Sequence, residues 1–251
     1  MSRRAHLLAV VGLLFLIPSL SFGGGFNFAY RSYAGILSAR VKGGRVDYAG
    51  LKAQRAGLDE FLTSANRVTT LQYDAWLERD RLAFLLNVYN AETLRLIVDR
   101  YPIASIRKIG PIWNPKAPWN LPTVRLFGRT MSLDDLEQRA IRTGFNEPRV
   151  HFALVCAAKG CPPLRSEAYE GVRLDAQLDD QARIFLAQAD KNRVDPALKR
   201  ARLSPIFKWY LVDFGGTKPA LLDYLRKWLP VEKDWSVSWT DYDWALNEDK
   251  K

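Results

Sequence analysis

The longest run of hydrophobic positions with helical spacing lies between Asp80 and Tyr101. Its apolar side chains surround the segment on most faces: Leu82, Leu85, Leu86, Tyr89, Leu94, Leu96 and Ile97. A distribution this wide predicts a central helix buried among other elements. Pro102 ends the segment, because proline has no N–H with which to continue a helix.

Two asparagines, Asn87 and Asn90, lie three positions apart on one face of this otherwise apolar helix. A buried amide without hydrogen-bond partners costs roughly 1–3 kcal/mol, so both side chains need partners. They either brace a neighbouring loop or line a functional site. Because buried polar side chains are generally satisfied within the fold, bracing is the favoured interpretation.

Shorter patterns predict the remaining elements. The other segments with helical spacing are 27–41, 51–64, 133–142, 175–189 and 217–228. Residues 124–127 and 129–131 predict a hairpin, and 235–240 alternates like a half-exposed strand. Residues 149–156 are nearly all apolar, as is typical of a central strand. We expect an α+β fold: a helix-rich single domain around a small, mainly antiparallel sheet.

Residues 1–23 have the three parts of a secretory signal peptide. Two arginines precede an apolar run from Leu7 to Pro18, and small residues follow up to Gly24. The small residues favour cleavage, which leaves residues 24–251 as one domain without a recognisable linker. We therefore expect a periplasmic or secreted protein. An uncleaved anchor in the inner membrane is the alternative.

The formal net charge of +10 indicates an acidic partner. An exported protein rarely meets nucleic acid, so we expect an anionic envelope polymer, a membrane surface or an envelope substrate or protein instead. The basic residues are scattered, which favours a solvated surface over one dense patch. A hydrophobic fraction of 48% excludes a disordered chain. Nothing in the sequence predicts a cofactor.

The segment 102–122 holds five prolines and two tryptophans, Trp113 and Trp119. We expect an ordered loop, because the two indole rings need to be buried somewhere. Long loops within compact domains are often functional.

The residues with reactive side chains cluster between His151 and Pro163. His6 lies in the leader, so His151 is the sole imidazole of the mature chain, and Cys156 and Cys161 are its cysteines. Two cysteines five positions apart in an exported protein are expected to form a disulfide. The small loop that they close would stabilise the fold by about 2 kcal/mol.

A thiol nucleophile is the second interpretation. A thiolate needs a base or a cationic neighbour, and the sole imidazole is the candidate base. On a strand, His151 and Cys156 point to opposite faces, whereas Cys161 lies beyond the turn and can fold back toward His151. Asp243 or Asp213 would then orient the imidazole.

A metal site is the third interpretation. His151, Cys156 and Cys161 would supply three ligands, but their spacing matches no standard zinc pattern and no second histidine follows. We therefore expect no metal at these residues.

Four blocks of the sequence carry a family resemblance. They are Asn87–Ala91, Pro148–Leu164, Leu203–Phe214 and Tyr242–Asn247. Together they resemble the hallmark blocks of the bacterial and plant family called domain of unknown function 547, over roughly residues 45–247. The block His-Phe-Ala-Leu followed by Cys-Pro-Pro-Leu is the most specific of them. The resemblance implies an uncharacterised exported or envelope protein.

A helix that leads to a histidine-bearing strand is also loosely similar to the papain and transglutaminase-like folds. In those folds a nucleophilic cysteine opens the central helix, where this chain offers Asn87 and Asn90 instead. The nucleophile is then absent or has moved to Cys156 or Cys161, and a likeness of fold carries little functional weight.

One functional hypothesis is a thiol-dependent hydrolase or transferase that acts on an amide or ester in the cell envelope. Cys161 or Cys156 would be the nucleophile and His151 the base, with Asn87 or Asn90 as the oxyanion or substrate donor.

The alternative is a non-catalytic binding or scaffold domain of the envelope. A Cys156–Cys161 disulfide would staple it, and Trp113 and Trp119 would form its contact surface.

Overall fold

The computed structural model describes residues 25–111 and 113–249. The predicted signal peptide, residues 1–23, lies outside the described residues. The longer helices are α1 (Arg31–Arg40), α3 (Ala56–Asn66), α5 (Glu78–Val98), α9 (Leu174–Leu186) and α11 (Lys218–Leu225). The shorter ones are α2 (Tyr48–Ala53), α4 (Thr70–Asp74), α6 (Ala117–Asn120), α7 (Leu133–Asp135), α8 (Val150–Ala153) and α10 (Pro205–Trp209). Three 3-10 turns are η1 (Ile106–Lys108), η3 (Gly171–Arg173) and η4 (Leu211–Phe214).

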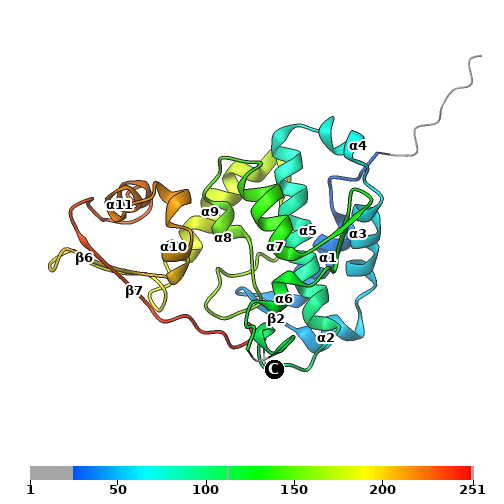
Figure 1. The fold of residues 1–251 in the computed structure, drawn as a ribbon, viewed down its shortest axis with the longest axis horizontal. Helices are drawn as coiled ribbons and strands as arrows, with labels where there is room; N and C mark the ends of the chain where they lie inside the picture. Colours follow the sequence, from blue (N-terminus) through cyan, green and yellow to red (C-terminus); the bar gives the residue numbers. More distant parts are fainter. Residues whose placement is uncertain (1–24, 112, 250–251) are drawn as a thin grey trace, which may run out of the picture.

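Helix α5 forms the centre of the larger part of the fold. Every residue from Leu82 to Leu94 is buried, which confirms the predicted central helix. Figure 1 shows α5 with α1 and α3 on one side and α7 and α9 on the other. This enclosure explains why its apolar residues form no single stripe. The predicted helix 51–64 is divided into α2 and α3.

A π-helical segment, η2 (Leu136–Arg142), continues α7. The predicted capping box is present: the Ser132 hydroxyl accepts from the Asp135 N–H, and the Asp135 carboxylate accepts from the Ser132 N–H. The wider turn of η2 departs from the regular helix predicted for 133–142. Such segments are rare and occur often at functional sites.

The described residues form three small sheets, where the sequence predicted a single one. The strands are β1 (Val41–Lys42) with β2 (Arg45–Val46), β3 (Val124–Leu126) with β4 (Arg129–Met131), and β5 (Arg193–Asp195), β6 (Arg200–Leu203) and β7 (Ser236–Trp239). All pairs are antiparallel except β6 with β7. The predicted α+β class, helix-rich with small and mainly antiparallel sheets, is therefore confirmed.

The predicted β3–β4 hairpin also forms. Phe127 and Gly128 connect its strands with φ of 53° and 68°. Positive φ at both residues is the geometry of a two-residue hairpin turn whose twist matches its strands.

The predicted strand at 149–156 is wrong. Val150–Ala153 forms the short helix α8, and Leu154 to Cys156 follows as extended chain outside any sheet. A short run of apolar residues is compatible with a buried strand and with a buried helix, and periodicity does not distinguish the two. In this fold the run is surrounded by helices, and among the described residues no strand pairs with it. His151 and Cys156 therefore do not alternate across a strand, and the expectation that their side chains point to opposite faces does not apply.

Buried side chains form a larger hydrophobic cluster around α5 and a smaller one around α9, α10 and α11. Helix α8 contributes to both, since Val150 and Ala153 belong to the larger cluster and Phe152 to the smaller. The residues of α8 therefore lie where the two clusters meet.

After β7 the chain returns toward the larger cluster, as the red segment of Figure 1 shows. The Asn247 N–H donates to the Ala157 carbonyl at 3.0 Å, and the Val46 N–H donates to the Asn247 carbonyl at 2.9 Å. The buried Tyr48 hydroxyl donates to Asn247 Oδ1 at 2.7 Å. These bonds fix the C-terminal segment beside the turn that follows α8.

The proline-rich segment 102–122 is partly helical, with η1 and α6. Trp119 is partly buried and packs on Trp244, with ring centroids 5.9 Å apart. Trp113, in contrast, is 87% exposed, so the expectation that both rings are buried is wrong. No helix of the described residues is long and apolar enough to span a membrane.

Candidate functional site

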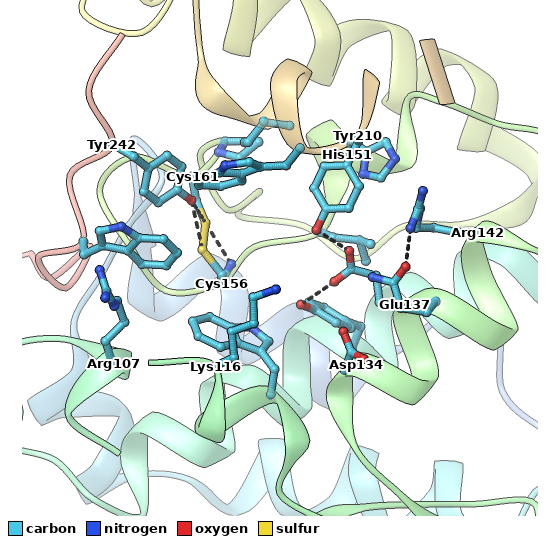
Figure 2. A pocket seen from close by; sticks show the side chains of 18 of the residues that line it. Arg107, Lys116, Asp134, Glu137, Arg142, His151, Cys156, Cys161, Tyr210 and Tyr242 are labelled. Atoms are coloured by element: carbon cyan, nitrogen blue, oxygen red, sulfur yellow. Dashed lines mark hydrogen bonds between the residues drawn. A yellow bond between two sulfur atoms is a disulfide. The ribbon is translucent and has the colours of Figure 1, made fainter. Parts of the chain in front are cut away.

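A cavity of about 800 Å³ opens where the two hydrophobic clusters meet. Its wall combines η2, α8, α10, the proline-rich segment and the C-terminal segment, and it includes both cysteines and His151. Figure 2 shows these side chains converging from elements far apart in the sequence. A concave site with a few convergent polar groups is the usual form of a ligand-binding or active site.

His151 lines this cavity and pairs with Asp213. Its Nε2 lies 2.6 Å from Asp213 Oδ2. Arg142, from η2, donates to both oxygens of the same carboxylate, at 2.6 Å and 2.7 Å. The Tyr210 ring stacks on the imidazole with centroids 4.0 Å apart.

The electrostatics of the pair are set by burial and by Arg142. Burial lowers the pKa of His151 to about 4, and it outweighs the opposing effect of Asp213. The hydrogen bonds from Arg142 hold the pKa of Asp213 below its usual value. His151 is therefore neutral at pH 7 beside an ionised carboxylate.

Glu137 is a buried carboxyl that lines the cavity. The Tyr210 hydroxyl donates to its Oε1 at 2.6 Å, and the Tyr89 hydroxyl donates to its Oε2 at 3.1 Å. Burial raises the pKa of Glu137, although both tyrosine bonds oppose the shift. Figure 2 shows the Glu137 carboxyl beside the phenol of Tyr210. A carboxyl with a raised pKa in a cavity has the properties of a proton donor or a polar anchor for a ligand.

Cys156 and Cys161 form a disulfide. Cys156 is half-buried, and Cys161 is buried at 3% exposure. The Tyr242 hydroxyl lies 3.1 Å from Cys156 Sγ and 3.0 Å from Cys161 Sγ. Neither cysteine of the chain is free, so no thiol nucleophile exists in this form.

The predicted catalytic residues are only partly brought together. His151 and both cysteines line one cavity, but among the described residues no hydrogen bond joins the imidazole to either sulfur. Of the two candidate carboxylates, Asp213 contacts His151. Asp243 is exposed and accepts from the Ala245 N–H within its own turn, at 2.8 Å.

Asn87 and Asn90 make two hydrogen bonds each with backbone groups and do not line the cavity. Asn87 donates to the Tyr169 carbonyl at 2.8 Å and accepts from the Tyr169 N–H at 2.9 Å. Asn90 donates to the Ala153 carbonyl and accepts from the Val155 N–H, both at 2.9 Å. Both asparagines thus hold neighbouring backbone in place, as expected if they brace a loop. Asn90 does so on both sides of Leu154.

No arrangement of His, Cys, Asp and Glu side chains suited to hold a metal ion occurs in the described part of the chain. The three metal ligands considered from the sequence have other partners: His151 is hydrogen-bonded to Asp213, and Cys156 and Cys161 form a disulfide with each other.

Aromatic side chains form the mouth of the cavity. The rings of Trp209, Tyr242 and Trp244 contact one another, with centroid distances of 4.8 Å for Trp209–Tyr242, 4.5 Å for Tyr242–Trp244 and 5.9 Å for Trp209–Trp244. Trp119 packs against Trp244 at 5.9 Å. The guanidinium of Arg107 lies 4.9 Å from the centroid of the Trp244 ring.

The family model described as "Protein of unknown function, DUF547" matches residues 73–186. This segment belongs to the DUF547 family. No curated protein matches the chain, and neither does a solved structure. The resemblance inferred from the sequence is confirmed over this segment, whereas similarity to papain-like folds stays a prediction.

The DUF547 segment supplies most of the residues that line the cavity. It contains Glu137, His151 and the disulfide, whereas Asp213 and Tyr242 lie beyond its end. The contacts of His151 with Asp213 and of the disulfide with Tyr242 therefore join the DUF547 segment to the chain that follows it.

The sequence analysis missed Glu137, Arg142, Tyr210 and Tyr242. Glu137 had a detectable signal, because it lies four positions after Leu133 on the buried stripe of a predicted helix. A carboxylate on such a stripe needs partners or a function. The two tyrosines gave no comparable signal, since aromatic residues on apolar faces are ordinary core residues.

Proposed function

We propose that this chain is an exported binding domain of the cell envelope, and that its aromatic cavity holds a segment of an anionic polymer. The observation that carries the proposal is the mouth of the cavity, where exposed cations lie beside a cluster of aromatic rings. This is the binding alternative predicted from the sequence, in which Trp113 and Trp119 formed the contact surface. Trp119 lines the cavity and is kept, whereas Trp113 is not among the lining residues.

The aromatic rings offer flat apolar faces to a ligand. Trp209 is 48% exposed, and Trp119, Tyr242 and Trp244 are half-buried around the same opening. Exposed aromatic side chains bury large areas on binding at a low cost in conformational entropy. A sugar ring or another flat unit of a polymer would pack against them.

The cations give the site its preference for an acidic ligand. Arg107 and Lys116 are exposed at the cavity, and neither forms an ion pair with another described residue. Arg142, in contrast, is neutralised by Asp213. Figure 2 shows Arg107 on the side of the disulfide and Asp134 on the side of Glu137. The anionic group of the ligand would therefore contact Arg107 and Lys116.

The disulfide favours binding over the thiol-dependent reaction. A thiol hydrolase or transferase needs a free sulfur within reach of a base. Both sulfurs are bonded to each other, and the Nε2 atom of His151 is directed to Asp213. A disulfide is also compatible with the oxidising compartments outside the cytoplasm, to which the N-terminal sequence would direct the chain.

Tryptophan fluorescence of the full chain tests the proposal. We expect polygalacturonate or polyphosphate to change the emission saturably, with an affinity that falls as salt is added. Neutral dextran should bind much more weakly. The double variant Arg107→Ala/Lys116→Ala should lose about tenfold or more in affinity, whereas Lys233→Ala, which removes an exposed cation away from the cavity, should not.

The two polyanions distinguish a carboxylate from a phosphate ligand. Absence of binding by both, or equal binding of dextran, would overturn the proposal. So would an unchanged affinity in the double variant.

A further inference from the structure

We propose that the Cys156–Cys161 disulfide is a thiol–disulfide exchange site, at which a small thiol attacks Cys156 Sγ and Cys161 leaves as the thiolate. This activity goes beyond polymer binding and does not depend on it, because it needs only access to one sulfur.

The two cysteines differ in exposure. Both cysteines line the cavity, but Cys156 is half-buried whereas Cys161 is 3% exposed. Figure 2 shows the disulfide at the cavity wall beneath Tyr242. A thiol that enters the cavity therefore reaches Cys156 first. Access decides which sulfur of a disulfide is attacked.

The hydrogen bonds favour Cys161 as the leaving group. Its Sγ accepts from the Cys156 N–H at 2.9 Å, a donor that Cys156 Sγ does not share. The Tyr242 hydroxyl lies 3.0 Å from Cys161 Sγ and 3.1 Å from Cys156 Sγ, so it is within reach of whichever sulfur leaves. When the bond breaks, the Cys156 N–H already points at the sulfur that gains the negative charge. Donors held in place for a developing charge lower the barrier without reorganisation.

Two further features support a thiolate at Cys161. Burial raises the pKa of Tyr242 far above its usual value, so the phenol keeps its proton and remains a donor. The ammonium of Lys191 donates to the Cys161 carbonyl at 2.6 Å and adds positive charge beside the leaving residue.

The exchange proceeds in two balanced steps. In the first, an incoming thiolate forms a bond with Cys156 Sγ, and the electron pair of the broken S–S bond moves to Cys161 Sγ. In the second, another thiolate attacks the incoming sulfur and releases the Cys156 thiolate. Two small thiols become one small disulfide, and the two protons that they release on forming thiolates are taken up, through water, by the Cys156 and Cys161 thiolates to give the protein dithiol.

The turn between the cysteines is held independently of the S–S bond. The Lys159 N–H donates to the Ala245 carbonyl and the Gly160 N–H to the Asp243 carbonyl, both at 2.8 Å. A side chain at Gly160 would meet the Tyr242 ring, since a Cβ there would lie 2.9 Å from it. Cys161 therefore stays beside Cys156 after reduction, which allows the disulfide to close again.

Peptide mapping after exchange tests the direction of attack. The oxidised full chain is treated briefly with glutathione, quenched with acid, alkylated with N-ethylmaleimide at acid pH, digested and analysed by mass spectrometry. We expect glutathione on Cys156 and the alkyl group on Cys161. The same chain in denaturant serves as the control and should carry glutathione on both cysteines.

Tyr242→Phe tests the leaving group, and Tyr224→Phe is the matched control. Loss of the hydroxyl at Tyr242 should slow exchange about tenfold, because it removes a hydrogen bond to a charged sulfur. Tyr224 is half-buried, lines no part of the cavity and should leave the rate unchanged. Circular dichroism establishes that both variants fold.

The mapping of the wild-type chain decides the proposal even if a variant fails to fold. Glutathione on Cys161, or equally on both cysteines in the folded chain, overturns it. A folded disulfide that resists glutathione while the unfolded one reacts also overturns it. An unchanged rate in folded Tyr242→Phe removes the assigned role of the hydroxyl.

Discussion

His151 and Asp213 join two segments that lie 62 positions apart, through a contact of 2.6 Å between Nε2 and Oδ2. The neighbours of both residues, Phe152 and Phe214, stack in the smaller hydrophobic cluster with ring centroids 5.9 Å apart. Arg142 adds a third segment to the contact. The pair therefore connects three segments of the fold, and its His151 also lines the cavity. Protonation of the imidazole should change the stability of the whole protein.

We expect His151 to reduce the stability of the protein in mild acid. Its pKa is about 4 in the folded chain, against an ordinary value of 6.5. Between these values the unfolded chain binds a proton that the folded chain resists, so the free energy of unfolding falls as the pH drops from 6.5 toward 4. The full effect is roughly 3 kcal/mol, from about 1.4 kcal/mol for each unit of pKa.

Urea denaturation of the wild type and of His151→Gln across this pH range measures the effect. Glutamine keeps a hydrogen-bonding side chain but cannot be protonated, so the difference between the two chains should change with pH below 6.5. A constant difference would show that Asp213 holds the imidazole protonated in the folded protein.

Glu92 should have the opposite pH dependence. Burial raises its pKa to about 7 despite the neighbouring Arg95. Its contribution to stability is present below the ordinary value of 4.5 and is lost as the pH rises toward 7. In Glu92→Gln this loss should disappear, whereas Glu60→Gln, on the exposed face of α3, should behave as the wild type. Equal pH profiles for all three chains would contradict the raised pKa.

Asn87 and Asn90 should contribute to stability through their backbone contacts. Asn87→Leu leaves the carbonyl and N–H of Tyr169 without partners, at a cost of about 1–3 kcal/mol for each buried group. Asn90→Leu does the same to Ala153 and Val155. Urea denaturation should show a large loss for each, and almost none for Asn66→Leu, an exposed position on α3. Wild-type stability in both variants would show that these amides are not structural.

The sequence predicted elements whose determinants are local. The apolar positions of α5, the capping box at Ser132 and the turn at Gly128 each specify their own short segment. Residues 149–156 failed because a buried apolar run has no period that distinguishes helix from strand. The surrounding helices, which no local pattern reveals, decide the conformation of that segment.

The sequence predicted only those residues of the site that lie close together along the chain. His151, Cys156 and Cys161 lie within eleven residues, and their grouping at one cavity follows the chain. From the sequence, Asp213 and Asp243 were both candidates for the carboxylate that orients His151. The packing of Phe214 against Phe152 brings Asp213 to the imidazole. Tyr242 reaches the sulfurs because Asn247 fixes the C-terminal segment beside the turn between the cysteines. This contact joins residues far apart in the sequence, so no motif spacing could have predicted it.

Alkylation distinguishes the binding domain from the thiol-dependent enzyme. Because both sulfurs lie in one disulfide, iodoacetamide in denaturant without reductant should modify neither Cys156 nor Cys161. The same treatment after reduction should modify both, which controls for reagent and access. A free thiol before reduction would support the thiol-dependent hydrolase or transferase instead. Its base would be His151, which lines the same cavity and is the only imidazole of the described residues. His151→Ala would then have to abolish the activity without unfolding the protein.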